Sequence, residues 1–125
     1  MKRFIEFLYG RHFLNHISHT LKYSLQESLK DCKSVLDIGC GSDSPLQYCK
    51  NVKYSVGVEA FRPYLVEAKK KKTHSKFINQ KAQELIFPEK SFDAVIMTEV
   101  LEHFPKKVSL QMLSKMEKWA KKKVV

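Results

Sequence analysis

The sequence predicts an α/β fold built on a doubly wound parallel sheet. Short β-branched runs alternate with segments of helical periodicity along most of the chain. This alternation is typical of parallel sheets whose strands are joined by helices. One strand runs directly into Gly39-Cys40-Gly41, a turn in which the backbone can approach a ligand closely. With 125 residues, the chain has room for a single core.

Each element follows from a local pattern. Pro45 suits the first turn of a helix after the first strand, with Asp43 or Ser44 as its cap. Pro63 marks the start of the next helix in the same way. The predicted elements are a helix over 4–30 that is interrupted near Gly10, strands over 34–38, 54–59, 76–79 and 92–97, and helices over 62–72 and 106–121.

The last residues predict a domain that is incomplete at the C-terminus. Val124-Val125 follow the last helix and a lysine run, and they resemble the first residues of a fifth strand. We expect an N-terminal helical extension over 1–32 and a ligand-binding part over 33–125 that lacks the later strands. An unfinished sheet exposes backbone groups on one edge, which would favour self-association.

The formal net charge of +10 is large for this length and raises the question of a polyanionic partner. Two lysine runs, Lys69 to Lys72 and Lys121 to Lys123, each lie at the end of a predicted helix, where cations favour the negative end of the helix dipole. No aromatic residue lies within either run to stack on bases. Solvated helix ends are therefore favoured, and nucleic acid stays an open but unindicated partner.

The composition indicates a soluble protein with reduced thiols. It is 43% hydrophobic and 29% charged. No apolar run approaches the roughly 20 residues of a membrane span, and the N-terminus does not match a signal peptide, so we expect a cytoplasmic protein with no membrane partner. Three cysteines without CxxC spacing argue against disulfides and a zinc site. Cys40 has no evident partner base and is expected to pack rather than to act as a nucleophile.

Two acids at the ends of predicted strands indicate the chemistry of the ligand. Asp37 ends an otherwise apolar strand beside Gly39, where a carboxylate would repel a pyrophosphate and attract an ammonium group. Glu59 closes the second strand, where an acid can accept both hydroxyls of an adenosine ribose. A dinucleotide fingerprint would also need glycine or alanine in place of Ser44. S-adenosylmethionine fits this description and NAD does not.

Four motifs, in the correct order, resemble those of class I S-adenosylmethionine-dependent methyltransferases, which have a Rossmann-like fold. The resemblance covers about residues 33 to 125 and implies an enzyme that transfers a methyl group to an acceptor. The matching stretches are Val35-Leu36-Asp37-Ile38-Gly39-Cys40-Gly41, Gly57-Val58-Glu59-Ala60, Ala82-Gln83-Glu84-Leu85-Ile86-Phe87-Pro88 with Ser91-Phe92-Asp93-Ala94-Val95, and Thr98-Glu99-Val100-Leu101-Glu102-His103-Phe104.

Motif and resemblance together indicate ten cofactor-binding residues. In the family, the glycine loop lies against the methionine part of the cofactor, the acid matched by Glu59 holds the ribose, and later residues close the adenine side. Lys81 departs from the many relatives that have an aspartate there to accept from the adenine amino group. Either backbone groups at Ala82 recognise adenine instead, or the affinity is low. The ten residues are Asp37, Gly39, Cys40, Gly41, Glu59, Ala60, Phe61, Ala82, Gln83 and Thr98.

Glu99, Glu102 and His103 have the i, i+3, i+4 spacing that places side chains on one helix face. Some methyltransferases of small RNAs and of quinone precursors carry a similar arrangement, which could bind a divalent metal. The same residues also occur in relatives that bind no metal. We expect no metal ion here and assign no catalytic residue.

The predicted function is methyl transfer from S-adenosylmethionine to an unidentified acceptor by in-line displacement. The chain would supply the cofactor-binding half and be inactive by itself, because the acceptor side of the pocket is set by later segments. Two alternatives remain. One is a Rossmann-like domain for another adenosine-containing ligand, such as a dinucleotide. The other is a scaffold module without catalysis that binds a polyanionic partner. Taken singly, Asp37 also fits a residue that caps a neighbouring helix, and Glu59 fits a solvated loop acid.

Overall fold

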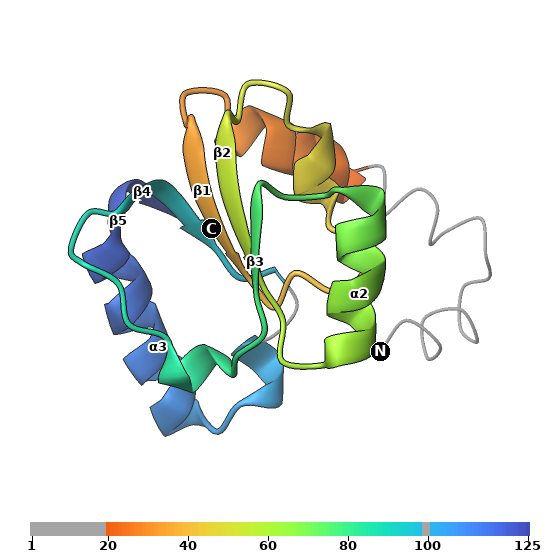
Figure 1. Cartoon of the computed structure of the whole chain (residues 1–125). Coiled ribbons are helices and arrows are strands. Elements are labelled where there is room, and N and C mark those ends of the chain that lie inside the picture. The colour runs from red at the N-terminus through yellow and green to blue at the C-terminus, as the bar shows by residue number, and fades with distance from the viewer. Residues whose placement is uncertain (1–19, 99–100) are drawn as a thin grey trace.

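Within residues 20–98 and 101–125, which the computed structural model describes apart from the Glu102 side chain, five strands form one parallel sheet. The sheet order is β3-β2-β1-β4-β5 (Figure 1). This order and the parallel pairing confirm the predicted α/β, doubly wound, Rossmann-like fold. The strands are β1 (Ser34–Ile38), β2 (Tyr54–Val58), β3 (Lys76–Ile78), β4 (Phe92–Ile96) and β5 (Ala120–Val124).

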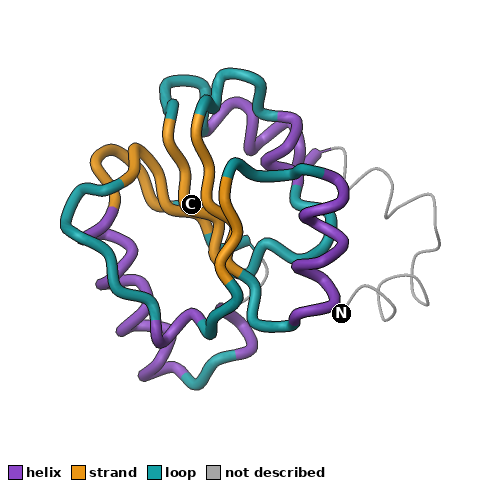
Figure 2. Tube along the Cα trace, viewed as in Figure 1, coloured by secondary structure: helices purple, strands orange, loops and turns teal. Residues whose placement is uncertain are grey.

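Helices cover both faces of the sheet (Figure 2). Helical residues 20–28 and α2 (Arg62–Lys71) lie on one side, and α3 (Lys106–Trp119) lies on the other. Successive side chains of β1 point to opposite faces, so Leu36 joins the core under α3 while Val35 joins the core under residues 20–28. Three short 3-10 turns complete the described chain: η1 (Pro45–Tyr48), η2 (Ala82–Glu84) and η3 (Leu101–His103).

The sheet topology positions the candidate site. The chain proceeds from β1 to β2 and β3 on one side, then returns to pair β4 with the other side of β1. Connections at the carboxyl ends of β1 and β4 therefore diverge, and ligands of such sheets bind in the crevice that this reversal opens. We call this side of the sheet the carboxyl edge and the opposite side, where the strands begin, the amino edge.

The C-terminal segment differs from its prediction. The last helix was expected to reach Lys121, but α3 ends at Trp119, and the lysine run lies in β5, a strand of five residues rather than two. Backbone hydrogen bonding to the open side of β4 outweighs the helical preference of the lysines. Val125 extends this pairing: its N–H donates to Val95 O, and its carbonyl accepts from the Met97 N–H. Lys123 Nζ also donates to Ser28 O at 2.7 Å and Asp31 Oδ1 at 2.9 Å.

The remaining predicted elements agree with the structure to within two residues, and Ser44 caps η1 by accepting from the Leu46 N–H. The helix expected over 4–30 is described only from residue 20, and its earlier part, including Gly10, lies outside the described residues. No helix in the described ranges is both long and apolar enough to span a membrane.

Trp119 anchors α3 to the sheet. Its side chain is 3% exposed and meets the Phe87 ring edge-on at 5.2 Å. We expect Trp119→Ala to lower the free energy of unfolding by about 3–5 kcal/mol, because it removes a large buried ring and leaves a cavity. Urea denaturation measures the change. Leu110→Ala on the same helix is the control, since Leu110 is 57% exposed and its loss should cost under about 1 kcal/mol. Equal effects would contradict the assignment.

Candidate functional site

The loop after β1 is shaped by two glycines. Gly39 and Gly41 have φ angles of 71° and 64°, in the left-handed region that side chains with a Cβ rarely adopt. The N–H groups of Gly39 and Cys40 both donate to Val58 O, at 2.8 and 2.9 Å, which fastens the loop to the end of β2. A Cβ built on Gly41 would meet no atom within 4 Å, so the space above the loop is open.

The Glu59 carboxylate links this loop to the next one. Oε1 accepts from the Gly41 N–H at 3.1 Å, and Oε2 accepts from the Phe61 N–H at 2.9 Å. Each oxygen keeps a further lone pair, because a carboxylate can accept about four hydrogen bonds. Glu59 is therefore held in place by the backbone and still able to accept from a ligand.

Asn79 adds the end of β3 to the same assembly, a role that the sequence analysis missed. Its side-chain amide donates to Glu59 O at 2.8 Å and to Ala60 O at 3.1 Å. An asparagine at the end of a predicted strand can be recognised in the sequence. Its hydrogen-bond partners cannot, because they lie 20 and 19 residues away. The ends of β1, β2 and β3 are thus connected by side chains of two residues, Glu59 and Asn79.

A pocket of about 350 Å³ opens between these strand ends and the start of α3. Its volume is in the range of small-molecule sites. Five of the ten predicted residues line it: Gly39, Glu59, Ala60, Ala82 and Gln83. Its other lining residues are Ile38, Val58, Gln80, Lys81 and Phe104. Phe104 was not assigned a contact with the ligand from sequence, although it ends the fourth motif.

The other five predicted residues do not line the pocket. Gly41 contributes through its bond to Glu59, and Thr98 is half-buried just after β4. Phe61 is 53% exposed and its ring meets Tyr64 edge-on at 4.7 Å. Cys40 and Asp37 lie underneath the loop and are buried.

Asp37 belongs to a buried polar network. Its Oδ2 accepts from the Ser44 hydroxyl at 2.5 Å and lies 2.9 Å from His74 Nε2. His74 Nδ1 in turn lies 2.7 Å from Thr73 Oγ1, and the His74 side chain is fully buried. Ser44 caps η1, so the geometry includes the capping role that was the alternative for Asp37. Contact of Asp37 with a ligand ammonium stays a prediction.

Gly57 makes room for this network. It pairs with Asp37 in the sheet, and a Cβ there would lie 2.8 Å from His74 Nδ1 and 3.0 Å from Cys40 Sγ. The glycine in the second motif is therefore explained by packing against the imidazole and the thiol. Neither contact is visible in the sequence, because His74 and Cys40 come from different loops.

Burial controls the chemistry of Cys40. Burial first, and then the charges of Asp37 and Glu59, raise the pKa of its thiol to about 12. A thiol with such a pKa stays protonated at neutral pH and is a poor nucleophile. This result agrees with the expected packing role.

The three residues with metal-ligand spacing, Glu99, Glu102 and His103, lie largely outside the described residues. Glu99 is one of the residues left undescribed, as is the side chain of Glu102, while His103 is exposed in η3. Among the described residues, no group of three His, Cys, Asp or Glu side chains is arranged to hold a metal ion.

Residues 36–123 match the model of a methyltransferase domain. The chain belongs to this methyltransferase family. The match covers more than half of the chain and includes all or most of each of the five described strands, so it confirms the resemblance carried by the four motifs. No curated protein matches the sequence.

The fold of this chain is similar to that of solved methyltransferase structures. Magnesium protoporphyrin IX methyltransferase from Synechocystis PCC 6803, solved with bound S-adenosylmethionine, is 21% identical, with a TM-score of 0.71 over 84% of this chain and 55% of its own. A SAM-dependent methyltransferase from Archaeoglobus fulgidus is 26% identical, with a TM-score of 0.69 over 94% and 52%. The chain thus spans about half the length of each of these two structures. Structures of the Synechocystis enzyme contain bound S-adenosylmethionine or S-adenosylhomocysteine.

His74 provides a test of the buried network. We expect His74→Ala to lower the free energy of unfolding by about 2–4 kcal/mol, because it leaves a cavity and removes one partner of the buried Asp37. Thermal or urea unfolding measures the loss. His103→Ala, at an exposed histidine, is the control and should change stability by less than about 0.5 kcal/mol. A His74 variant as stable as the control would show that the network does not support the loop.

The Cys40 thiol provides a test by pH. The pKa of the Cys40 thiol is higher in the folded chain than the unfolded value of 9.0. Burying the protonated thiol therefore stabilises the fold fully below about pH 9, and this stabilisation is lost as the pH rises toward 12. At pH 9 we therefore expect iodoacetamide to label Cys40 rapidly in urea and only slowly in the native chain, as read by mass spectrometry. Cys40→Ser identifies the adduct. Equally fast labelling in both states would contradict the burial of the thiol.

Proposed function

We propose that this chain binds S-adenosylmethionine in the pocket at the carboxyl edge and supplies the cofactor-binding half of a methyltransferase. The observation that carries the proposal is the placement of Glu59. Its carboxylate is fixed by two backbone N–H groups, lines the pocket and retains lone pairs that can accept both hydroxyls of a ribose.

The remaining lining fits the other parts of this cofactor. Gly39, with no Cβ, lets the methionine part approach the end of β1. Ala60 and Ala82 offer small surfaces on which the adenine ring can lie, and the backbone at Ala82 can bond its edge. Lys81 lines the same wall, and its ammonium can donate to adenine but not accept from it.

A dinucleotide fits less well. Glu59 would suit the ribose of NAD, but Ser44 stands where the fingerprint needs glycine or alanine. In the structure Ser44 is buried, caps η1 and donates to Asp37, so the helix start is already occupied by side chains. A pyrophosphate would gain little there.

When bound, S-adenosylmethionine supplies an electrophilic methyl group on a sulfonium, and its transfer to a nucleophile leaves the neutral thioether. The domain would contribute orientation, because bringing two reactants into line lowers the barrier without a covalent intermediate. We propose further that the domain takes part in methyl transfer in the cytoplasm and that its cofactor-binding part begins at residue 33.

Calorimetry with S-adenosylhomocysteine tests the site. We expect Glu59→Gln to weaken binding about 10- to 100-fold, because it removes a charge from two hydrogen bonds. Glu67→Gln on exposed α2 is the matched control and should bind normally. Unchanged affinity in folded Glu59→Gln would contradict the ribose assignment. Binding of NAD but not of S-adenosylhomocysteine by the unmodified chain would overturn the proposed cofactor.

A further inference from the structure

Exposed lysines gather at the amino edge of the sheet. Because all strands are parallel, the segments that lead into them meet at this edge. These segments are residues 29–33, 50–53, 72–76, 89–91 and 120–122, and we call them together the lysine edge. All of their lysines are exposed: Lys30, Lys33, Lys50, Lys53, Lys72, Lys76, Lys90, Lys121 and Lys122.

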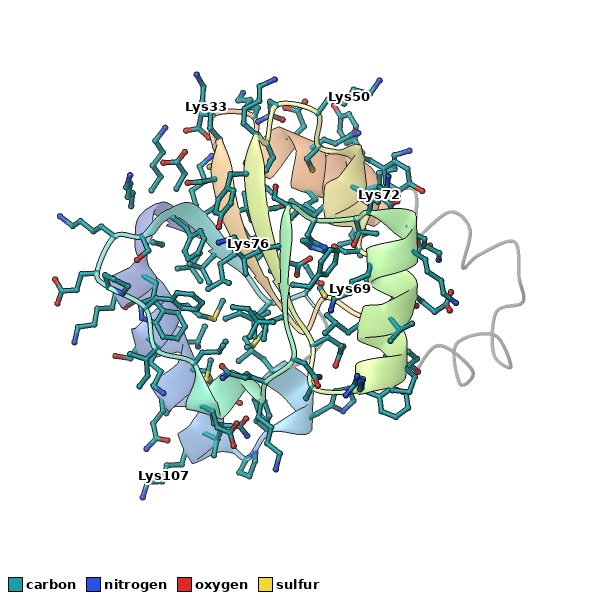
Figure 3. All side chains as sticks on the ribbon, in the orientation of Figure 1. Lys33, Lys50, Lys69, Lys72, Lys76 and Lys107 are labelled. Carbon is teal, nitrogen blue, oxygen red and sulfur yellow. The ribbon has the colours of Figure 1, made fainter. Side chains whose placement is uncertain are left out.

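The opposite edge has a different charge. The loops 39–44, 59–61 and 79–81 at the carboxyl edge contain one lysine, Lys81, and two acids, Asp43 and Glu59. Figure 3 shows Lys33, Lys50 and Lys72 far from Lys107, which lies in the first turn of α3. The amino edge therefore carries more lysines than these loops of the carboxyl edge.

The carboxylates near the lysine edge have partners of their own. Asp93 accepts from the N–H groups of Lys33 and Ser34, and the first of these bonds is the main cause of its lowered pKa. Asp31 pairs with Lys123, and Glu89 pairs with Lys118. Among the described residues, none of the lysines of the lysine edge forms an ion pair.

Helix dipoles do not account for this charge. Residues 20–28, α2 and α3 end near this edge, and each C-terminus carries a partial charge of roughly −0.5. Nine lysines exceed these partial charges and the three nearby carboxylates together. This surplus of positive charge favours binding of a polyanion, because counterions released from such a partner drive binding.

Tyr54 is an exposed aromatic residue at this edge. It begins β2 directly after Lys53, its side chain is 40% exposed, and its N–H group donates to Lys33 O at 3.0 Å. Tyr48, which precedes the segment 50–53, is 44% exposed, and a lysine outside the lysine edge, Lys22, has its Nζ 4.0 Å from the Tyr48 ring centroid. Aromatic faces among cations are typical of sites on which unpaired bases stack. An anionic membrane would instead favour apolar side chains that insert, and these five described segments expose none.

We propose that the lysine edge binds single-stranded nucleic acid. The strands of five residues between the edges span about 16 Å, so this surface is separate from the cofactor pocket. Its lysines would contact phosphates, and Tyr54 would stack on a base. The proposal does not depend on methyl transfer, because binding at this edge uses no residue of the pocket.

Fluorescence anisotropy with a labelled 16-nucleotide oligouridine tests the surface. Binding should weaken with salt at a log–log slope of about −3, as expected for some four phosphate contacts. In Lys33→Gln/Lys53→Gln the slope should become shallower by about 1.4, with at least tenfold weaker binding at 50 mM salt. Tyr54→Ala should weaken binding about fivefold or more without changing the slope.

Lys106→Gln/Lys107→Gln is the control, since it removes the same charge from the start of α3. This variant should bind like the unmodified chain, and an equal loss in both pairs would overturn the proposal. Tighter binding to a duplex than to the single strand would also overturn it. Sedimentation with vesicles containing 30% phosphatidylserine is the membrane arm, and vesicle binding without oligouridine binding would assign the surface to a lipid headgroup instead. Unfolding curves of each variant confirm that it is folded.

Discussion

Parallel strand pairing around β1 is the constraint on which the rest of the molecule depends. It places every strand end at one edge and every strand start at the other, so loops far apart in sequence become neighbours. At the carboxyl edge this brings together Gly39, Glu59 and Asn79, whose hydrogen bonds connect the ends of three strands. An antiparallel arrangement of the same segments would separate these residues and leave no common pocket.

The pocket floor is supported from beneath by polar groups rather than by apolar packing alone. Under the glycine loop, the Asp37 carboxylate accepts from the Ser44 hydroxyl and lies within hydrogen-bond distance of the His74 ring. Gly57 leaves the space that the imidazole occupies. A buried network of this kind is favourable only when its members are paired, because each unpaired group would carry a desolvation cost. The loop conformation and the pairing of the network therefore depend on each other.

Local patterns were sufficient to predict what is local. Gly39 and Glu59 lie at the ends of strands that β-branched runs predict, and both line the pocket. His74 could not be predicted, because its partner Asp37 lies 37 positions away and the contact exists only in the folded sheet. The last helix was predicted to continue to Lys121 because propensity is read from neighbours in sequence, whereas the open side of β4 ended the helix at Trp119. Strand starts are scattered in sequence, so a search for contiguous runs could not find the charge they assemble.

The site is held together by hydrogen bonds within the chain, and the partners of these bonds show how. Val58 O holds the glycine loop, and the Glu59 carboxylate holds the loop and the Phe61 N–H, while Asn79 holds the backbone of Glu59. None of these bonds needs a ligand, so little ordering remains to be done on binding. The same bonds use only part of the accepting capacity of the carboxylate. A ligand with paired hydroxyls can therefore bind the Glu59 carboxylate without breaking these bonds. An acid whose acceptor sites were all used by backbone N–H groups could not bind such a ligand.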